Sequence, residues 1–226
     1  MNLDYTVIFS SRRKKLTITV ERDRSVVVRA PEGMDLEKIH QVVASRKPWI
    51  FAKTRHPQKQ GELPPPPGKE LVSGESMPYL GRHYRLEITP GDVGAIRFLN
   101  KFKVSKAADS NLKDLFCRWY KDKARQKIPE RVKRHAQALG VAVNQVKILE
   151  LKYRWGSCTP KNNLNFNWRL IMAPVFVIDY VIIHELAHIL EHNHSEAFWN
   201  IVKAQIPTYE KAKVWLAEHG EYLMHY

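Results

Sequence analysis

The sequence predicts an α+β fold, with a strand-rich N-terminal part followed by a helical part that contains a β-hairpin. Three observations support this. Short alternating apolar stretches, separated by glycine and proline, fill most of the first half. A long helical pattern follows, and a strongly apolar helix lies near the C-terminus. The chain has 226 residues, enough to bury a substantial core. We expect two domains, residues 1–108 and 109–226.

The first part begins with two predicted strands and a helix. In residues 16–20 apolar side chains alternate with threonines, and a valine-rich run covers residues 25–29 after a charged turn at 21–24. Asp35 can cap a helix, and the apolar spacing after it predicts that the helix runs towards Arg46.

A proline-rich connector is expected at residues 58–69, where Pro64 to Pro67 are consecutive. Such a run favours a stiff, extended spacer at a subdomain boundary, with a proline-rich recognition ligand as the alternative. Residues 76–104 then contain short strand-like pieces separated by glycines. This half of the sequence shows no catalytic combination of residues, and its histidines are isolated.

The second part opens with a long helical pattern. It starts at Ser110, a candidate N-cap, and ends at Leu139, where Gly140 is a stop signal. Pro129 lies inside the pattern and predicts a kink or a division into two helices.

A β-hairpin is expected next, with strands at residues 146–151 and 163–170 and a turn at 153–158. The second strand has leucine, phenylalanine and tryptophan on one face and asparagine and arginine on the other. As an edge strand it could bind an extended substrate by adding a strand to the sheet. An ordinary half-buried hairpin is the alternative.

Three helices are predicted for the remaining residues. An apolar helix includes residues 181–190, and Pro174 suits its first turn. Asn193 can adopt the left-handed conformation that ends a helix. Ser195 can cap the next helix, and Gly220 is expected to close the last one.

The chain is strongly basic, with a net charge of +14. This balance favours contact with nucleic acid, anionic membranes or phosphorylated small molecules. The charge is spread along the chain, however, and residues 159–200 hold only two basic residues against four acidic ones. We therefore expect most of these charges to be solvated surface, and nucleic-acid binding is left open.

The sequence also carries indications of the compartment. Cys117 and Cys158 are too few for a disulfide scaffold, which is typical of a reducing environment. Residues 1–10 lack the features of a signal peptide, and no apolar run is long enough to span a membrane. We expect a cytoplasmic protein without a membrane partner, and the sequence does not predict its oligomeric state.

The apolar helix contains the pattern H-E-x-x-H at His184, Glu185 and His188. Histidines four residues apart lie on one face of a helix, so both imidazoles can reach the same metal ion. Glu185 is then placed to take a proton from a water molecule that the metal activates. The alternative is a core helix that carries two hydrogen-bonded histidines and a solvated glutamate.

A third candidate ligand follows the helix at His194. Three histidines with an open fourth position are typical of a catalytic zinc site. His192 is the alternative third ligand, although it lies close to the helix end. Cys158 is either a fourth ligand or, as we expect, a buried structural cysteine.

Four runs together carry a resemblance to a known family. They are R-W-G-S-C at residues 154–158, the strand 164–170 with a proline after it, D-Y-V-I-I-H-E-L-A-H at 179–188, and H-S-E-A-F-W at 194–199. With them the chain resembles the YgjP-like metallopeptidase family over nearly its whole length. Its catalytic core is similar to the SprT and WLM groups of zincin peptidases. The resemblance implies a zincin-like second domain, Zn²⁺ bound by His184, His188 and His194, and Glu185 as general base.

We therefore expect a zinc-dependent metallohydrolase, most simply a metallopeptidase acting on a peptide or protein. Tyr153, Arg154 and Tyr209 are candidates for an additional oxyanion donor. One alternative keeps the metal and hydrolyses a phosphoanhydride such as a nucleoside triphosphate. Another is a non-enzymatic module that binds nucleic acid or protein through a vestigial metal site.

Overall fold

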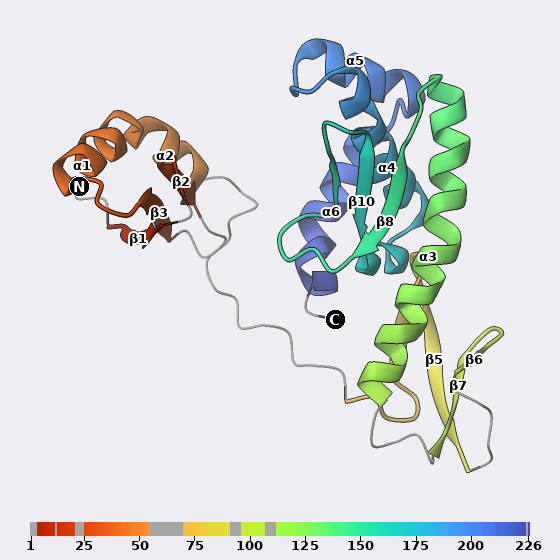
Figure 1. Cartoon of the computed structure of the whole chain (residues 1–226). Helices are drawn as coiled ribbons and strands as arrows, with labels where there is room; N and C mark the ends of the chain where they lie inside the picture. The colour runs from red at the N-terminus through yellow and green to blue at the C-terminus, as the bar shows by residue number, and fades with distance from the viewer. Residues whose placement is uncertain are drawn as a thin grey trace. The chain divides into compact units, whose positions relative to one another are not determined.

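The computed structural model describes residues 4–11, 13–20, 25–54, 70–90, 96–106, 112–224 and 226. The charged turn at 21–24, the prolines at 64–67 and the Ser110 cap, all discussed above, lie outside these ranges. The fold is mixed α+β, as predicted, and the chain divides into two compact units, Met1–Pro66 and Pro67–Tyr226 (Figure 1). No helix in the described ranges is both long and apolar enough to cross a bilayer.

The first unit is a small three-stranded sheet with two helices. Strand β3 (Val26–Pro31) is central, with β1 (Thr6–Ser10) parallel on one side and β2 (Thr17–Val20) antiparallel on the other. Helix α1 (Leu36–Ser45) begins where Asp35 accepts a hydrogen bond from the Glu37 amide, as predicted, and α2 (Lys47–Thr54) follows. The core of this unit consists of Val20, Val26, Val28, Ala30, Ile39, Val43 and Ile50.

The second unit begins with a four-stranded sheet in the order β4-β5-β7-β6. Its strands are β4 (Ser76–Tyr79), β5 (Arg82–Thr89), β6 (Arg97–Phe98) and β7 (Phe102–Ser105).

The turn between β4 and β5 is tied to the helical part of the same unit. The amides of Leu80 and Gly81 donate to the carbonyls of Ile171 and Met172. Gly81 has φ +76°, and a Cβ there would lie 2.6 Å from the Pro174 Cα, so only glycine fits. The division at Pro66 and Pro67 therefore falls within the proline-rich connector, at the predicted subdomain boundary, and not at the domain boundary expected at 108/109. Local sequence signals identify these strands but not the elements they pack against.

Helix α3 (Leu112–Leu139) forms one side of the second unit. Gly140, with φ +68°, ends it as predicted, and Pro129 lies inside it without dividing it. Every fourth residue of this helix is buried: Leu112, Phe116, Tyr120, Ala124, Ile128, Val132 and Ala136.

The second sheet of this unit has the order β8-β10-β9. Strand β10 (Asn163–Asn167) is central, parallel to β8 (Gln145–Leu149) and antiparallel to β9 (Gly156–Cys158). Of the two alternatives for residues 163–170, the edge strand is therefore wrong. The expected hairpin with residues 146–151 is also wrong, because β8 runs parallel to β10, and the antiparallel partner of β10 is β9. The edge beside α4 is β9, which lies inside the expected turn.

The end of β10 also differs from the prediction. The Asn167 side chain accepts a hydrogen bond from the Arg169 amide and donates to the Leu151 carbonyl. This cap turns the chain into a 3-10 helix, η2 (Trp168–Met172), where the alternating pattern had predicted more strand.

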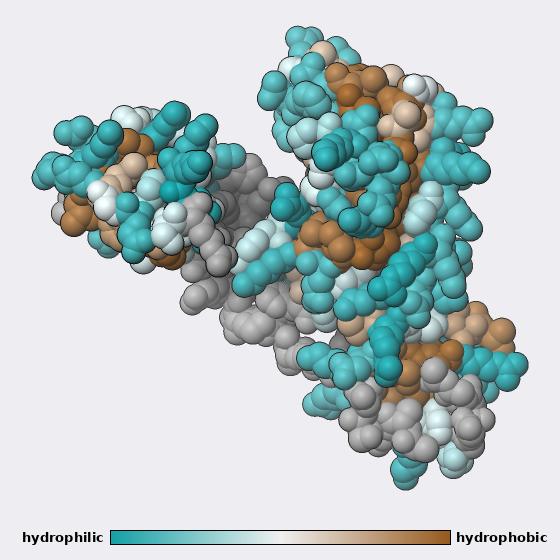
Figure 2. Space-filling model, in the orientation of Figure 1, coloured by the Kyte–Doolittle hydropathy of each residue, from teal (hydrophilic) through white to brown (hydrophobic). Residues whose placement is uncertain are grey.

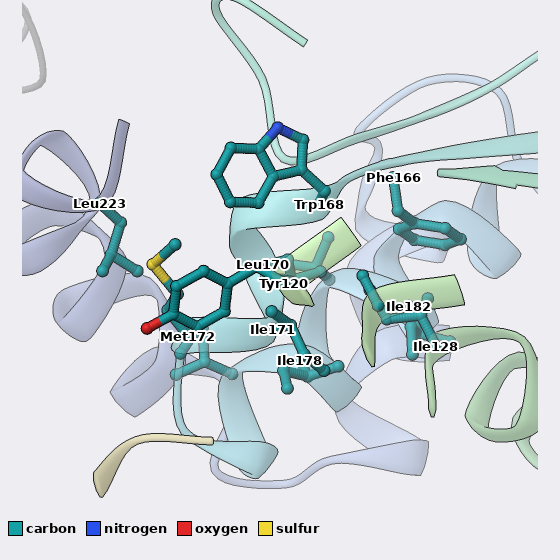
Figure 3. Packing of buried hydrophobic residues seen from close by; sticks show 14 of the residues in the cluster. Tyr120, Ile128, Phe166, Trp168, Leu170, Ile171, Met172, Ile178, Ile182 and Leu223 are labelled. Atoms are coloured by element: carbon teal, nitrogen blue, oxygen red, sulfur yellow. The ribbon is translucent and has the colours of Figure 1, made fainter. Parts of the chain in front are cut away.

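Three helices complete the second unit: α4 (Val175–Leu190), α5 (Glu196–Gln205) and α6 (Tyr209–Met224). The Ser195 hydroxyl accepts a hydrogen bond from the Phe198 amide, so the predicted cap of α5 is confirmed. Gly220 does not close α6. It is buried inside the helix, where a Cβ would lie 3.3 Å from the Trp155 ring. Figure 3 shows the core, in which Tyr120 and Ile128 of α3 and Ile178 and Ile182 of α4 lie near η2.

An ion pair joins α3 to α4 at Asp179. The Arg131 Nε lies 2.6 Å and the His135 Nε2 2.9 Å from the Asp179 Oδ1. Burial by itself would raise the pKa of Asp179, but the hydrogen bonds from His135 and Arg131 hold it at about 2. Because this pKa is below its unfolded value, the carboxylate stabilises the fold at neutral pH, by about 2 kcal/mol.

We expect Asp179→Asn to lower the melting temperature at pH 7 by about 4–8 °C. The difference from the wild type should shrink as the pH falls from about 4 towards 2, where the wild-type carboxylate becomes protonated. Asp122→Asn is a matched control, because Asp122 pairs with Arg125 while both side chains are largely exposed. Equal melting temperatures for Asp179→Asn and the wild type at pH 7 would contradict this account.

Candidate metal centre

Three histidines of the second unit converge on one point. Helix α4 places His184 and His188 one turn apart, and His194 lies in the connection to α5. The Nε2 atoms of His184 and His194 are 3.1 Å apart, and the possible ligand atoms of all three residues lie within 4.8 Å of one another. Among the described residues this is the group of histidine, cysteine and acidic side chains that could hold a metal ion.

The turn after α4 brings His194 back towards the helix. The chain leaves α4 at Glu191, which is extended with φ −137°, and the Glu191 carboxylate accepts a hydrogen bond from the Asn193 amide. Asn193 is not among the residues with positive φ, so the expected left-handed turn at this position is wrong. The buried Phe198 ring then contacts all three imidazoles, with centroid distances of 4.6–4.9 Å.

Hydrogen bonds to backbone carbonyls orient the imidazoles of His188 and His192. The His188 Nδ1 lies 3.2 Å from the Glu191 carbonyl oxygen, which leaves its Nε2 free to accept a metal ion. The exposed His192 lies outside the group, and its Nδ1 is 3.0 Å from the His188 carbonyl oxygen. The structure therefore brings His194, and not His192, to the other two. The His184 Nδ1 is buried without a hydrogen bond in the described part of the chain.

The surroundings favour neutral imidazoles. Burial lowers the pKa of His184 to about 3, with further contributions from His188, His194 and Lys213. Burial and the nearby His188 also lower the pKa of His194. A neutral imidazole is the form that binds a metal ion. Three imidazole nitrogens at these separations fit a divalent metal ion that keeps an open coordination position.

Glu185 is buried beside this group, with 6% of its surface exposed. Burial raises its pKa to about 7, while the positive charge of Arg154 and a hydrogen bond from the Cys158 amide act in the opposite direction. The carboxylate packs against strand β9, where a Cβ on Gly156 would lie 2.6 Å from the Glu185 Oε1. This role of Gly156 was not predicted from the sequence. The signal for it was the glycine inside R-W-G-S-C.

We expect Gly156→Ala to reduce hydrolytic activity by about a hundredfold, because the new methyl group must displace the Glu185 carboxylate. Gly156 does not have a positive φ, so the effect is steric rather than conformational. Ser157→Ala is the control, since it alters the same strand and removes only a hydrogen bond from Asn165. Full activity in Gly156→Ala would show that the packing against Glu185 is not required.

The remaining sequence candidates have different surroundings. Burial and the charge of Glu185 raise the pKa of Cys158, which lies outside the histidine group. Of the three candidate oxyanion donors, Tyr153 is 56% exposed. Arg154 acts electrostatically on Glu185, and Tyr209 stacks against Tyr180 of α4.

A hydrophobic groove lies elsewhere on the second unit, between α3 and the start of β8 (Figure 2). It encloses about 530 Å³ and contains none of the three histidines. Its single charged lining residue is Lys133, so it offers no comparable chemistry. Its lining residues are Pro129, Val132, Lys133, Ala136, Gln137, Val141, Val143, Asn144, Gln145 and Val146.

Comparisons with known proteins agree with this geometry at the level of the family. The family model described as YgjP-like, metallopeptidase domain, matches residues 14–219. No curated protein matches the chain. The chain is similar to the crystal structures of two metallopeptidase zymogens, both with a TM-score of 0.36 and 20% sequence identity. For Pyrococcus abyssi abylysin the match covers 39% of this chain and 91% of the other, and for Methanocaldococcus jannaschii jannalysin 41% and 96%.

Proposed function

The chain belongs to the YgjP-like metallopeptidase family, and on that premise we propose that it is a zinc-dependent hydrolase of peptide bonds. The observation that supports this most strongly is the convergence of three imidazoles beside a buried carboxylate. A purely structural metal site needs no carboxylate beside its ligands. Burying one there would lower the stability of the fold without a benefit to function. This argues against a non-enzymatic module with a vestigial metal site.

In this proposal His184, His188 and His194 hold the zinc ion through their imidazole nitrogens. When bound, the ion would act as a Lewis acid towards the scissile carbonyl and lower the pKa of the attacking water. The Phe198 ring packs against the three imidazoles and keeps bulk water from that side of the site.

Glu185 is the general base. A pKa of about 7 suits a carboxylate that must accept a proton from water and later deliver it to the leaving amine. The Cys158 amide and the backbone of Gly156 hold its carboxylate in place. Burial raises the pKa of this carboxyl group, and the positive charge of Arg154 partly opposes that effect.

Strand β9 offers a place for an extended substrate. It contacts α4 and is the last strand of its sheet within the described residues. Its outer edge therefore has backbone groups that can pair with a peptide. A peptide paired there would run past the Glu185 carboxylate, which lies against Gly156 of the same strand.

A second candidate function is the hydrolysis of a phosphoanhydride such as a nucleoside triphosphate. It is favoured by two positive charges at the site, since Arg154 acts on Glu185 and Lys213 acts on His184. The same zinc ion and base could serve either substrate, because both reactions need an activated water.

One experiment tests both candidates. Zinc-loaded protein is incubated with casein and, separately, with a panel of nucleoside triphosphates, and new peptides and released phosphate or diphosphate are assayed. Glu185→Gln protein, purified in the same way, reports contaminating enzymes. Peptide release only by the wild type supports the proposed function. Release of phosphate or diphosphate alone would replace it with the second candidate, and no turnover of either kind would contradict both.

A further inference from the structure

A set of stacked aromatic rings forms one wall of the metal centre. We call Tyr180, Trp199 and Tyr209 the aromatic layer. The Trp199 ring stacks on His194, with a centroid distance of 5.8 Å and an interplanar angle of 25°, and lies 6.0 Å from the His184 ring. Tyr209 stacks on Trp199 at 5.4 Å, and Tyr180 stacks on Tyr209 at 6.3 Å. The layer thus continues directly from two of the proposed metal ligands.

Lys213 places a positive charge on this layer. It follows Tyr209 by one turn of α6, and its Nζ lies 4.8 Å from the Trp199 ring centroid and 5.5 Å from the Tyr209 centroid. Contacts of this kind are attractive and hold the ammonium group over the rings rather than extended into water. The ammonium group lies near the metal centre, since the Trp199 ring beneath it stacks on His194.

The Lys213 ammonium is available to a substrate. Its side chain is 40% exposed, and its ion-pair partner, Glu210, is 61% exposed with an N···O distance of 3.0 Å. Exposed pairs of this kind are weak, because water screens them, so another carboxylate can replace Glu210. A ligand with a negative group is therefore favoured at the Lys213 ammonium.

We propose that Lys213, held over Trp199 and Tyr209, forms a subsite that binds a carboxylate of the peptide substrate close to the scissile bond. The carboxylate comes from an aspartate or glutamate side chain or from the C-terminus of the peptide. This inference rests on the proposed peptidase function and specifies its substrate class. Lys213 is a specificity-determining residue, and the metal ligands and Glu185 keep the roles given above.

The test uses pairs of fluorogenic peptides based on one sequence that the enzyme cleaves. One pair differs only by Glu or Gln next to the scissile bond, and another only by a free or amidated C-terminus. Each peptide is assayed with wild type, Lys213→Met, Lys213→Arg and, as the control, Lys211→Met, which removes an exposed lysine of the same helix. Methionine keeps the apolar stem that covers the rings but removes the charge.

We expect the wild type to prefer the acidic member of at least one pair by about tenfold in kcat/KM, mainly through KM. In Lys213→Met this ratio should fall to about one, whereas Lys213→Arg and Lys211→Met should keep it. The pair that shows the preference identifies the source of the carboxylate. A purely structural role for Lys213 would lower both kcat/KM values together and leave their ratio unchanged, which would overturn the inference.

A binding measurement separates this inference from the proposed function. Fluorescence anisotropy of labelled peptides with Glu185→Gln protein, with and without the Lys213→Met change, requires no turnover. Tighter binding of the acidic peptide that depends on Lys213 supports the subsite even if the wild type cleaves no peptide. Cleavage of peptides without any acidic preference, together with equal binding, overturns the subsite and leaves the proposed function intact.

Discussion

Alanine at His184, His188 or His194 is expected to reduce bound zinc from close to one ion per chain to a small fraction. Each substitution leaves only two of the three imidazoles that lie within 4.8 Å of one another. Two imidazoles bind zinc far more weakly than three, because each substitution removes one metal–nitrogen bond. Metal analysis of dialysed protein measures the effect and also identifies the bound metal.

His192→Ala is the matched control for these variants. His192 lies in the same turn, but its Nδ1 is hydrogen-bonded to the His188 carbonyl and it is not part of the group. The His192→Ala variant should therefore retain the metal. If His192→Ala lost zinc while His194→Ala kept it, the proposed ligand set would be wrong.

Glu185→Gln is expected to lower hydrolysis by about two to four orders of magnitude while zinc stays bound. The amide keeps the shape of the side chain but cannot accept a proton from water. The variant should be at least as stable as the wild type, because burial disfavours the charged carboxylate and raises its pKa to about 7. Activity, zinc content and melting temperature are measured on the same preparation.

The melting temperature makes this result interpretable. A loss of activity with zinc retained and stability unchanged assigns the defect to the lost base. Retained turnover would mean that the reaction does not depend on Glu185. Loss of zinc in Glu185→Gln would instead indicate a role in shaping the site, contrary to the separate roles proposed here.

Much of the fold follows from short-range signals that the sequence displays directly. Asp35 and Ser195 cap the helices they were expected to cap, and Gly140 ends α3. The helical spacing of His184 and His188 already implied that both imidazoles share a face of α4. These features depend only on residues within about one helical turn, so local stereochemistry is sufficient to predict them.

Features that depend on distant residues were not predictable in the same way. Gly220 was predicted to end the last helix. It lies inside α6 instead, where the Trp155 ring packs against it. Asn193 was predicted to adopt a left-handed backbone conformation, whereas the chain leaves α4 at Glu191 and Asn193 has no positive φ. The alternating pattern of residues 163–170 identified a strand, but a pattern of period two does not show which strands pair with it.

The sequence by itself therefore determined the α+β class, the helix that carries H-E-x-x-H and the set of candidate residues His184, Glu185, His188 and His194. Their roles as ligands and base stay predictions. Only the tertiary structure decided that β9 is the edge strand against Glu185, that Gly156 leaves room for the carboxylate, and that Lys213 lies over Trp199 beside the imidazoles. The physical reason is that caps and periodicity act within a few residues. Strand order and close packing, in contrast, are set by contacts between segments far apart in the chain.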